Sequence, residues 1–218
     1  MEKIINKARN LRINQEHPAF LLDIPRMKFN KAIIFDTFQN YAKLTGVPPT
    51  VFEQIKDGCT IIRGDTHIVL THTQTVAPLN KRNAAHISAS PKRTSDLTGR
   101  KNWTLAHEVG HIMLGHTSDG EQEERQANCF AAELLMPELI MLELERRLAR
   151  PLSVHEVRRL FGVSQTAAEN RIAQIRRKTR FSIYLKQEFA EKYKQLINDY
   201  VKKHHNQKLK QQSILVEC

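Results

Sequence analysis

The stretch "TLAHEVGHIMLGH", from Thr104 to His116, decides the reading of the whole chain. His107 and His111 are four residues apart, and Glu108 follows the first histidine directly. Residues four apart on a helix project from the same face, so both imidazoles can reach a single ion. The neighbouring positions are apolar, which indicates a partly buried helix over residues 103–116 and not a surface loop.

The pattern H-E-x-x-H is typical of a helical zinc site, with the two histidines as ligands. Glu108 stands close enough to touch a metal-bound water without being a ligand, and it can take the water's proton as that water attacks a carbonyl. Gly110 costs about 1 kcal/mol relative to alanine in a helix interior. We therefore expect a second backbone or side chain to approach closely at Gly110.

A catalytic zinc usually has three protein ligands and a water, so a third ligand is expected. The stretch "EQEERQANCFAAELLMP" (residues 121–137) follows shortly, and it predicts a helix over 121–135 with an apolar stripe. Glu123 and Glu124 both fall under the N-terminal end of that stripe, whereas Glu121 lies off it. The spacing does not choose between Glu123 and Glu124, and an acidic first turn favoured by the helix dipole is an alternative explanation.

Together, "WTLAHEVGHIMLGH" and "ERQANCFAAELLMP" resemble the ImmA/IrrE family of metallopeptidases over about 35 residues. The resemblance implies one Zn²⁺ per chain, held by His107, His111 and Glu124, with Glu108 as the catalytic general base. Trp103 stands where the family usually has phenylalanine. The resemblance also implies the substrate class, a helix-turn-helix transcriptional repressor whose cleavage releases silenced genes, as in phage and mobile elements.

The remaining histidines are interpreted more simply. His116 matches a frequent family position but lies off the ligand face, so we interpret it as a structural residue or a partner of a ligand. The other seven are expected to be ordinary surface or hydrogen-bonded residues, although one of them, or a tyrosine or arginine, could stabilise the oxyanion. They are His17, His67, His72, His86, His155, His204 and His205.

Upstream of the motif, the pattern predicts a helix over residues 31–45 that ends at Gly46, then a short helix up to Gly58. Two β-branched runs around Gly64–Asp65 predict a hairpin. Residues 74–102 are polar, with six Lys or Arg and one Asp, and form either a long loop or a loop with a further edge strand. We expect this segment to gate or dock the substrate. The expected fold is α+β: a mostly helical, zincin-like (gluzincin) core with a small β-sheet beside the active-site helix.

Charge is concentrated in the last third of the chain. Residues 141–218 hold 17 of the 34 Lys and Arg but 8 of the 23 acidic residues, within a formal net charge of +11. We therefore divide the chain into a metallopeptidase domain, 1–140, and a basic helical region, 141–218, that ends in a long amphipathic helix over about 182–210. This region is expected to contact the protein substrate, with non-specific nucleic-acid binding at low salt.

The segment "SVHEVRRLFGVSQTAAENRI" (153–172) resembles a helix-turn-helix, with a turn at Gly162 and Ser164 as the cap of the second helix. DNA reading and packing within the globular unit are both open, and packing is favoured. Only Asn170, Arg171 and Gln174 on the second helix are expected to face outward with base-reading chemistry, together with Gln165 at its start.

Three dispersed cysteines, no signal peptide and no membrane-spanning apolar run predict a cytoplasmic protein without disulfides. The sequence thus favours a zinc-dependent endopeptidase that acts as an antirepressor in transcription regulation. Two alternatives remain: a DNA-binding regulator with a structural or sensory zinc site, and a protein-binding antirepressor that works without cleavage.

Overall fold

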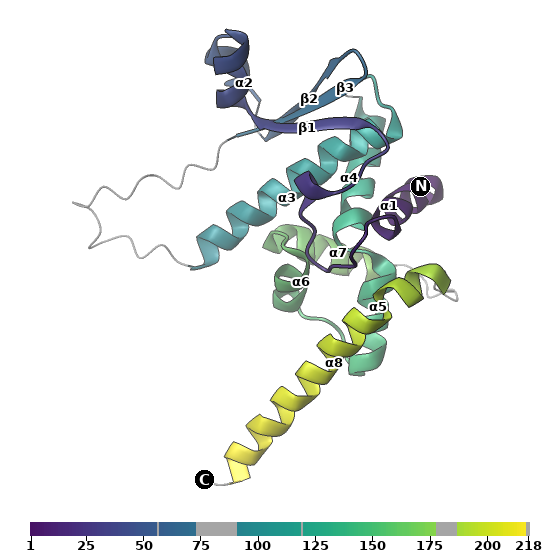
Figure 1. Ribbon diagram of the computed structural model, residues 1–218. Coiled ribbons are helices and arrows are strands. Elements are labelled where there is room, and N and C mark those ends of the chain that lie inside the picture. The colour runs from purple at the N-terminus through teal and green to yellow at the C-terminus, as the bar shows by residue number, and fades with distance from the viewer. Residues whose placement is uncertain (56, 73–90, 119, 178–186, 217–218) are drawn as a thin grey trace, which may run out of the picture.

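The computed structural model describes residues 1–55, 57–72, 91–118, 120–177 and 187–216. A three-stranded sheet lies across helix α3 at one end of the molecule, and the C-terminal helices gather at the other end (Figure 1). The helices are α1 (Glu2–Ile13), α2 (Phe38–Thr45), α3 (Pro91–Leu114), α4 (Glu121–Leu135), α5 (Glu138–Leu148), α6 (Val154–Phe161), α7 (Gln165–Arg177) and α8 (Gln187–Val216). The strands are β1 (Ala32–Thr37), β2 (Gly58–Arg63) and β3 (Thr66–Thr71), with short 3-10 turns at Ile24–Arg26 and Pro49–Phe52. The expected α+β, mostly helical fold is confirmed.

The sheet has the order β1-β3-β2, so β2 lies at an edge. Strands β2 and β3 form the predicted antiparallel hairpin, which turns at Gly64 with a φ of 57°. Val69 packs in the main core with α3, whereas its neighbours Ile68 and Leu70 pack against α2 on the other face. Because side chains alternate along a strand, His67 lies on the same α3-facing side as Val69. On the neighbouring strand β2, Ile62 pairs with His67 and Thr60 pairs with Val69, so both lie on this side as well.

The single helix expected over residues 31–45 is wrong in its first half, which is strand β1. Residues 32–37 pair in parallel with β3, and the β-branched Ile33 and Ile34 suit that extended conformation. Thr37 then caps helix α2 through a hydrogen bond from the Asn40 backbone N–H, and Gly46 ends it with a φ of 71°. The short helix expected next is only the 3-10 turn at Pro49–Phe52.

The motif helix is longer at its start than predicted. Helix α3 begins at Pro91 and ends at Leu114, not at 103 and 116. Residues 91–102 of the expected long loop are therefore helical, and residues 73–90 lie outside the described residues. Helix α4 matches its predicted bounds of 121–135.

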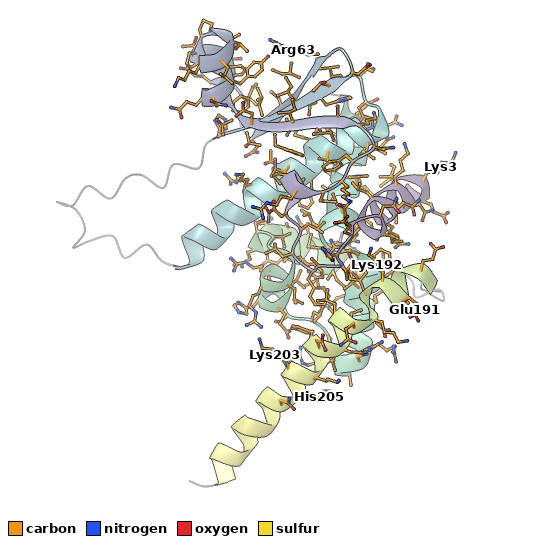
Figure 2. The ribbon with its side chains drawn as sticks, viewed as in Figure 1. Lys3, Arg63, Glu191, Lys192, Lys203 and His205 are labelled. Atoms are coloured by element: carbon orange, nitrogen blue, oxygen red, sulfur yellow. The ribbon has the colours of Figure 1, made fainter. Side chains whose placement is uncertain are left out.

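One hydrophobic cluster joins α1 and helices α3 to α8, from Ile4 to Ile197. It contains residues on both sides of position 140, such as Leu134 and Phe161. The division of the chain at residue 140 stays a prediction. Beyond this core, α8 extends away from the other helices, and it carries Lys203 and His205 on its distal part (Figure 2).

A buried charge cluster ties the core together. Glu133 on α4 is paired with Arg9 at 2.7 Å and with Arg171 on α7, and the side chain of Glu133 is fully buried. Arg171 also donates a hydrogen bond to the Met136 carbonyl and is only 4% exposed. The expectation that Arg171 faces outward is therefore wrong, because it neutralises a buried carboxylate.

Within the described chain, no helix has both the length and the apolar character that a membrane crossing requires.

Candidate metal centre

Helix α3 turns its histidines away from the core while its apolar residues hold it in place. Leu105, Ala106, Val109 and Ile112 are buried in the main cluster. On the side facing α4, a Cβ atom added to Gly110 would lie 3.2 Å from the Ala127 carbonyl oxygen. The close backbone approach expected at Gly110 is therefore present, and it brings the first turn of α4 beside the motif.

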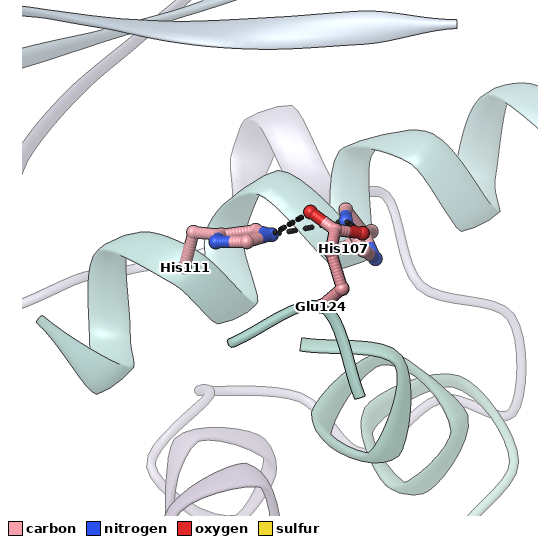
Figure 3. A group of neighbouring side chains, drawn as sticks. All are labelled: His107, His111 and Glu124. Atoms are coloured by element: carbon pink, nitrogen blue, oxygen red, sulfur yellow. Dashed lines mark hydrogen bonds and ion pairs between the residues drawn. The ribbon is translucent and has the colours of Figure 1, made fainter. Parts of the chain in front are cut away.

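This approach brings one carboxylate of α4 to both motif histidines (Figure 3). The two Glu124 carboxylate oxygens lie 3.3 Å from His107 Nε2 and 3.3 Å from His111 Nε2, and the two Nε2 atoms are 3.0 Å apart. His107, His111 and Glu124 form a cluster that could hold a metal ion. The Glu123 carboxylate lies instead near Gly120, at the helix N-terminus.

These separations fit a zinc ion. Bonds of about 2.0–2.2 Å at tetrahedral angles separate neighbouring ligand atoms by about 3.3–3.5 Å. Each histidine Nε2 lies 3.3 Å from a different oxygen of Glu124, and one ligand atom from each of the three residues lies within 4.8 Å of the other two, which is compatible with a shared ion. Two imidazoles and one carboxylate also match the donor set of a catalytic zinc site.

Both histidines have partners at their other ring nitrogen, as metal-bound histidines usually do. His107 Nδ1 lies 3.1 Å from Asn128 Oδ1, which can only accept a hydrogen bond, so Nδ1 carries the proton. His111 Nδ1 lies 3.1 Å from His116 Nδ1. With Nδ1 protonated, His107 Nε2 keeps a lone pair, and it lies close to both Glu124 and His111 Nε2.

The sheet contributes a hydrogen bond that orients Glu108. Thr60 on β2 donates a hydrogen bond of 2.7 Å from Oγ1 to Glu108 Oε2. Glu108 is only 9% exposed, and the part that is accessible faces the cavity beside His111 and Glu124. This is the location that a proton-accepting carboxylate beside a metal ion requires.

The cavity has a volume of about 560 Å³ and lies between the edge strand and the motif helix. Its lining includes Thr60, Ile62 and His67 from the sheet, and Lys31, whose Nζ donates to the Ile112 carbonyl at 2.7 Å. Among the described residues, His67 Nδ1 is buried without a hydrogen-bond partner.

Sequence reasoning missed several residues of this site. It interpreted His67 as ordinary, and it overlooked Thr60, Lys31, Gln126 and Asn128. Asn128 alone had a usable signal, since it lies four residues after Glu124 on one helical face. Thr60 and His67 are separated from the motif by tens of residues and carry no local signal.

Comparison with known proteins bears on the same segment. Residues 94–173 match the family model described as Peptidase_M78, the IrrE N-terminal-like domain. Neither the search of curated proteins nor the search of solved structures found a match. The matched segment contains His107, Glu108, His111 and Glu124, and it continues through α6 into α7. Over these residues the resemblance read from the sequence is confirmed, because this part of the chain matches the IrrE N-terminal-like domain of the Peptidase M78 family.

Proposed function

We propose that the protein is a zinc-dependent endopeptidase that cleaves a helix-turn-helix transcriptional repressor. The observation that carries the proposal is the convergence of His107, His111 and Glu124 in one cluster, with His111, Glu124 and Glu108 lining the adjacent cavity. The family match supports a metallopeptidase. Three protein ligands leave a position for water, as hydrolysis requires.

The side chains divide the reaction between them. Zinc, when bound, supplies a Lewis acid that makes water a competent nucleophile at neutral pH. Glu108 accepts the proton of the attacking water and delivers it to the nitrogen of the leaving amine. Thr60 keeps the Glu108 carboxylate turned towards the reacting atoms through its hydrogen bond.

The edge strand suits an extended peptide substrate. Strand β2 pairs with β3 on one side only within the described sheet, and its residues line the cavity. An extended chain can add to such an edge through backbone hydrogen bonds, while side-chain pockets select the sequence. Ile62 is 56% exposed on this strand beside the site and offers an apolar contact to a substrate side chain.

The packing of the helix-turn-helix-like segment disfavours DNA reading. A Cβ atom added to Gly99 on α3 would lie 2.4 Å from the Ser164 nitrogen, and Asn102 donates to the Gly162 carbonyl at 2.9 Å. Helix α3 therefore covers the turn and the start of α7. A DNA-reading helix would need that same N-terminal end free, because it is the end that contacts base edges in the major groove. Arg171 is buried as well, which leaves a packing role for this segment.

The repressor substrate rests on the resemblance of the sequence to the ImmA/IrrE family. A small repressor encoded beside this gene would be the first substrate to test. Cleavage separates the proposal from its rival, an antirepressor that acts by binding alone.

The test compares wild type with Glu108→Gln, both loaded with zinc, on that repressor and on a peptide mixture analysed by mass spectrometry. Glu108→Gln should keep its zinc and lose hydrolysis, because an amide preserves size but cannot accept the proton. Glu123→Gln makes the same chemical change away from the metal ligands and should cleave normally. Repressor binding by wild type without any cleaved bond would favour the binding-only antirepressor, and a fourth protein ligand on the metal would favour a structural zinc.

A further inference from the structure

Helix α3 ends in a turn that brings His116 back against His111. Gly115 adopts a left-handed conformation with a φ of 76°. The Gly115 N–H donates to the carbonyls of Ile112 and His111, and the His116 N–H donates to the His111 carbonyl at 3.0 Å. This is a Schellman ending, which reverses the chain direction. The two imidazole rings therefore meet edge to face, with centroids 5.0 Å apart.

A chain of hydrogen bonds runs from α4 through His116 to the metal ligand. His116 Nε2 lies 3.0 Å from Gln126 Oε1, and His116 Nδ1 lies 3.1 Å from His111 Nδ1. The Gln126 oxygen can only accept, so His116 carries its proton on Nε2. With its proton on Nε2, His116 accepts at Nδ1 from the Nδ1–H of His111, which leaves the lone pair of His111 on Nε2.

The polarity of this chain matters because it could run in either direction. If the Gln126 amide were reversed, its NH₂ group would donate to His116, and His116 would donate to His111. His111 would then carry its proton on Nε2, where the metal binds. Metal-bound histidines usually donate their other N–H to a carboxylate, a backbone carbonyl or a water. Here a histidine and an amide, each able to donate or accept, take that place.

We propose that His116, held by Gln126, is a positioning residue that fixes the tautomer and ring orientation of His111 for metal binding. The inference rests on the metal site of the proposed function. It assigns Gln126 to the site through its side-chain oxygen, although it lies on α4 two residues beyond the ligand Glu124. Gly115 contributes to this arrangement because its left-handed turn places the His116 ring against His111.

Substitutions at His116 test the acceptor directly, with zinc affinity measured by competition against a chromogenic chelator at fixed pH. His116→Leu removes the acceptor, and zinc affinity should fall by about 10- to 100-fold, the usual loss for a missing partner of a metal-bound histidine. His116→Asn places an amide oxygen at the position of Nδ1, so its affinity should stay within a few-fold of wild type. Equal losses in His116→Leu and His116→Asn would overturn the proposal.

Substitutions at Gln126 test the polarity of the chain. Gln126→Leu should weaken zinc binding in the wild-type background and have no further effect when combined with His116→Asn. Gln126→Glu can only accept from His116, so its affinity should equal or exceed that of wild type. Gln122→Glu adds the same charge one helical turn away on an exposed part of α4 and controls for electrostatic attraction alone. A gain in Gln122→Glu as large as in Gln126→Glu would assign the effect to charge.

A spectroscopic measurement separates positioning from general support of the fold. In the zinc-loaded protein labelled with ¹⁵N-histidine, the Nδ1 proton of His111 should exchange slowly in wild type and His116→Asn, and rapidly in His116→Leu. Unchanged exchange in His116→Leu would contradict the proposal. A folded wild type that binds no zinc would remove the proposed metal site itself, whereas tight zinc binding by wild type, His116→Leu and Gln126→Leu alike would remove only the role of His116 and Gln126.

Discussion

Replacing Thr60 by valine removes one hydroxyl and keeps the shape of the side chain. Thr60 Oγ1 donates to Glu108 Oε2 at 2.7 Å across the cavity wall, and Glu108 is nearly buried. A hydrogen bond to a charged group contributes about 1.5–3 kcal/mol. If all of this free energy serves to hold the general base in its reactive position, kcat/KM should fall by about 10- to 150-fold, at 1.36 kcal/mol for each factor of ten.

The assay measures kcat/KM on a cleaved peptide together with zinc content. Thr60→Val should keep its zinc, because Thr60 contacts Glu108 and not the ligand cluster. Thr60→Ser restores the hydroxyl and should recover most of the rate. Thr104→Val is the matched control, since its hydroxyl donates to the Arg100 carbonyl within α3. Its kcat/KM should stay near that of wild type.

Two results would refute this reasoning. A Thr60→Val enzyme with unchanged kcat/KM would show that Glu108 needs no orientation from the sheet. A fall in rate that follows a loss of zinc would assign Thr60 to metal retention instead.

Four further predictions concern the metal, the core, acid stability and nucleic acid. Metal analysis should find near-stoichiometric zinc in wild type and in Glu123→Ala but a sharp loss in His111→Ala and Glu124→Ala; full occupancy in His111→Ala would exclude the site. Glu133→Gln leaves its two arginine partners without a counter-charge, so urea denaturation should show a loss of about 3–5 kcal/mol, and a loss below 1 kcal/mol would mean that water reaches the cluster. The Arg150 guanidinium, with help from Ser153, holds the pKa of Glu156 below its usual value. This carboxylate therefore contributes stability that is fully present above pH about 4.5 and declines as the pH falls below it. The difference in unfolding free energy between wild type and Glu156→Gln should shrink on acidification, and a constant difference would contradict the assignment. Gel shifts at near-physiological salt should show less than a hundredfold preference for the gene's own upstream DNA over a scrambled duplex, whereas a larger preference would indicate specific reading.

The sequence by itself determined the features that lie within one element. The four-residue spacing of His107 and His111 places both side chains on one face of any helix. Gly110 in the helix interior predicted the close approach of a second backbone, which the structure contains. The turn chemistry around Gly64 and Gly162 likewise marked the hairpin and the boundary between α6 and α7. Each of these signals acts over a few residues, so helical or strand periodicity is enough to read it.

The choice of Glu124 over Glu123 drew on more than one element. The apolar stripe left both glutamates open, because each falls under its N-terminal end. Family resemblance pointed to Glu124, and the packing of α4 on α3 brings that carboxylate to both histidines.

Contacts between distant segments were decided only by the tertiary structure. Residues 32–37 fit a helical pattern together with α2, but pairing with β3 makes them a strand, because a sheet partner outweighs local propensity. Thr60 reaches Glu108 from 48 residues away, since β2 lies over α3. The five-residue spacing of His111 and His116 places His116 off the ligand face of an ideal helix. The His116 ring nevertheless contacts His111, because Gly115 reverses the chain direction. Arg171 is buried because it neutralises Glu133 on another helix. The sequence of α7 alone does not predict this burial, because the partner lies outside α7.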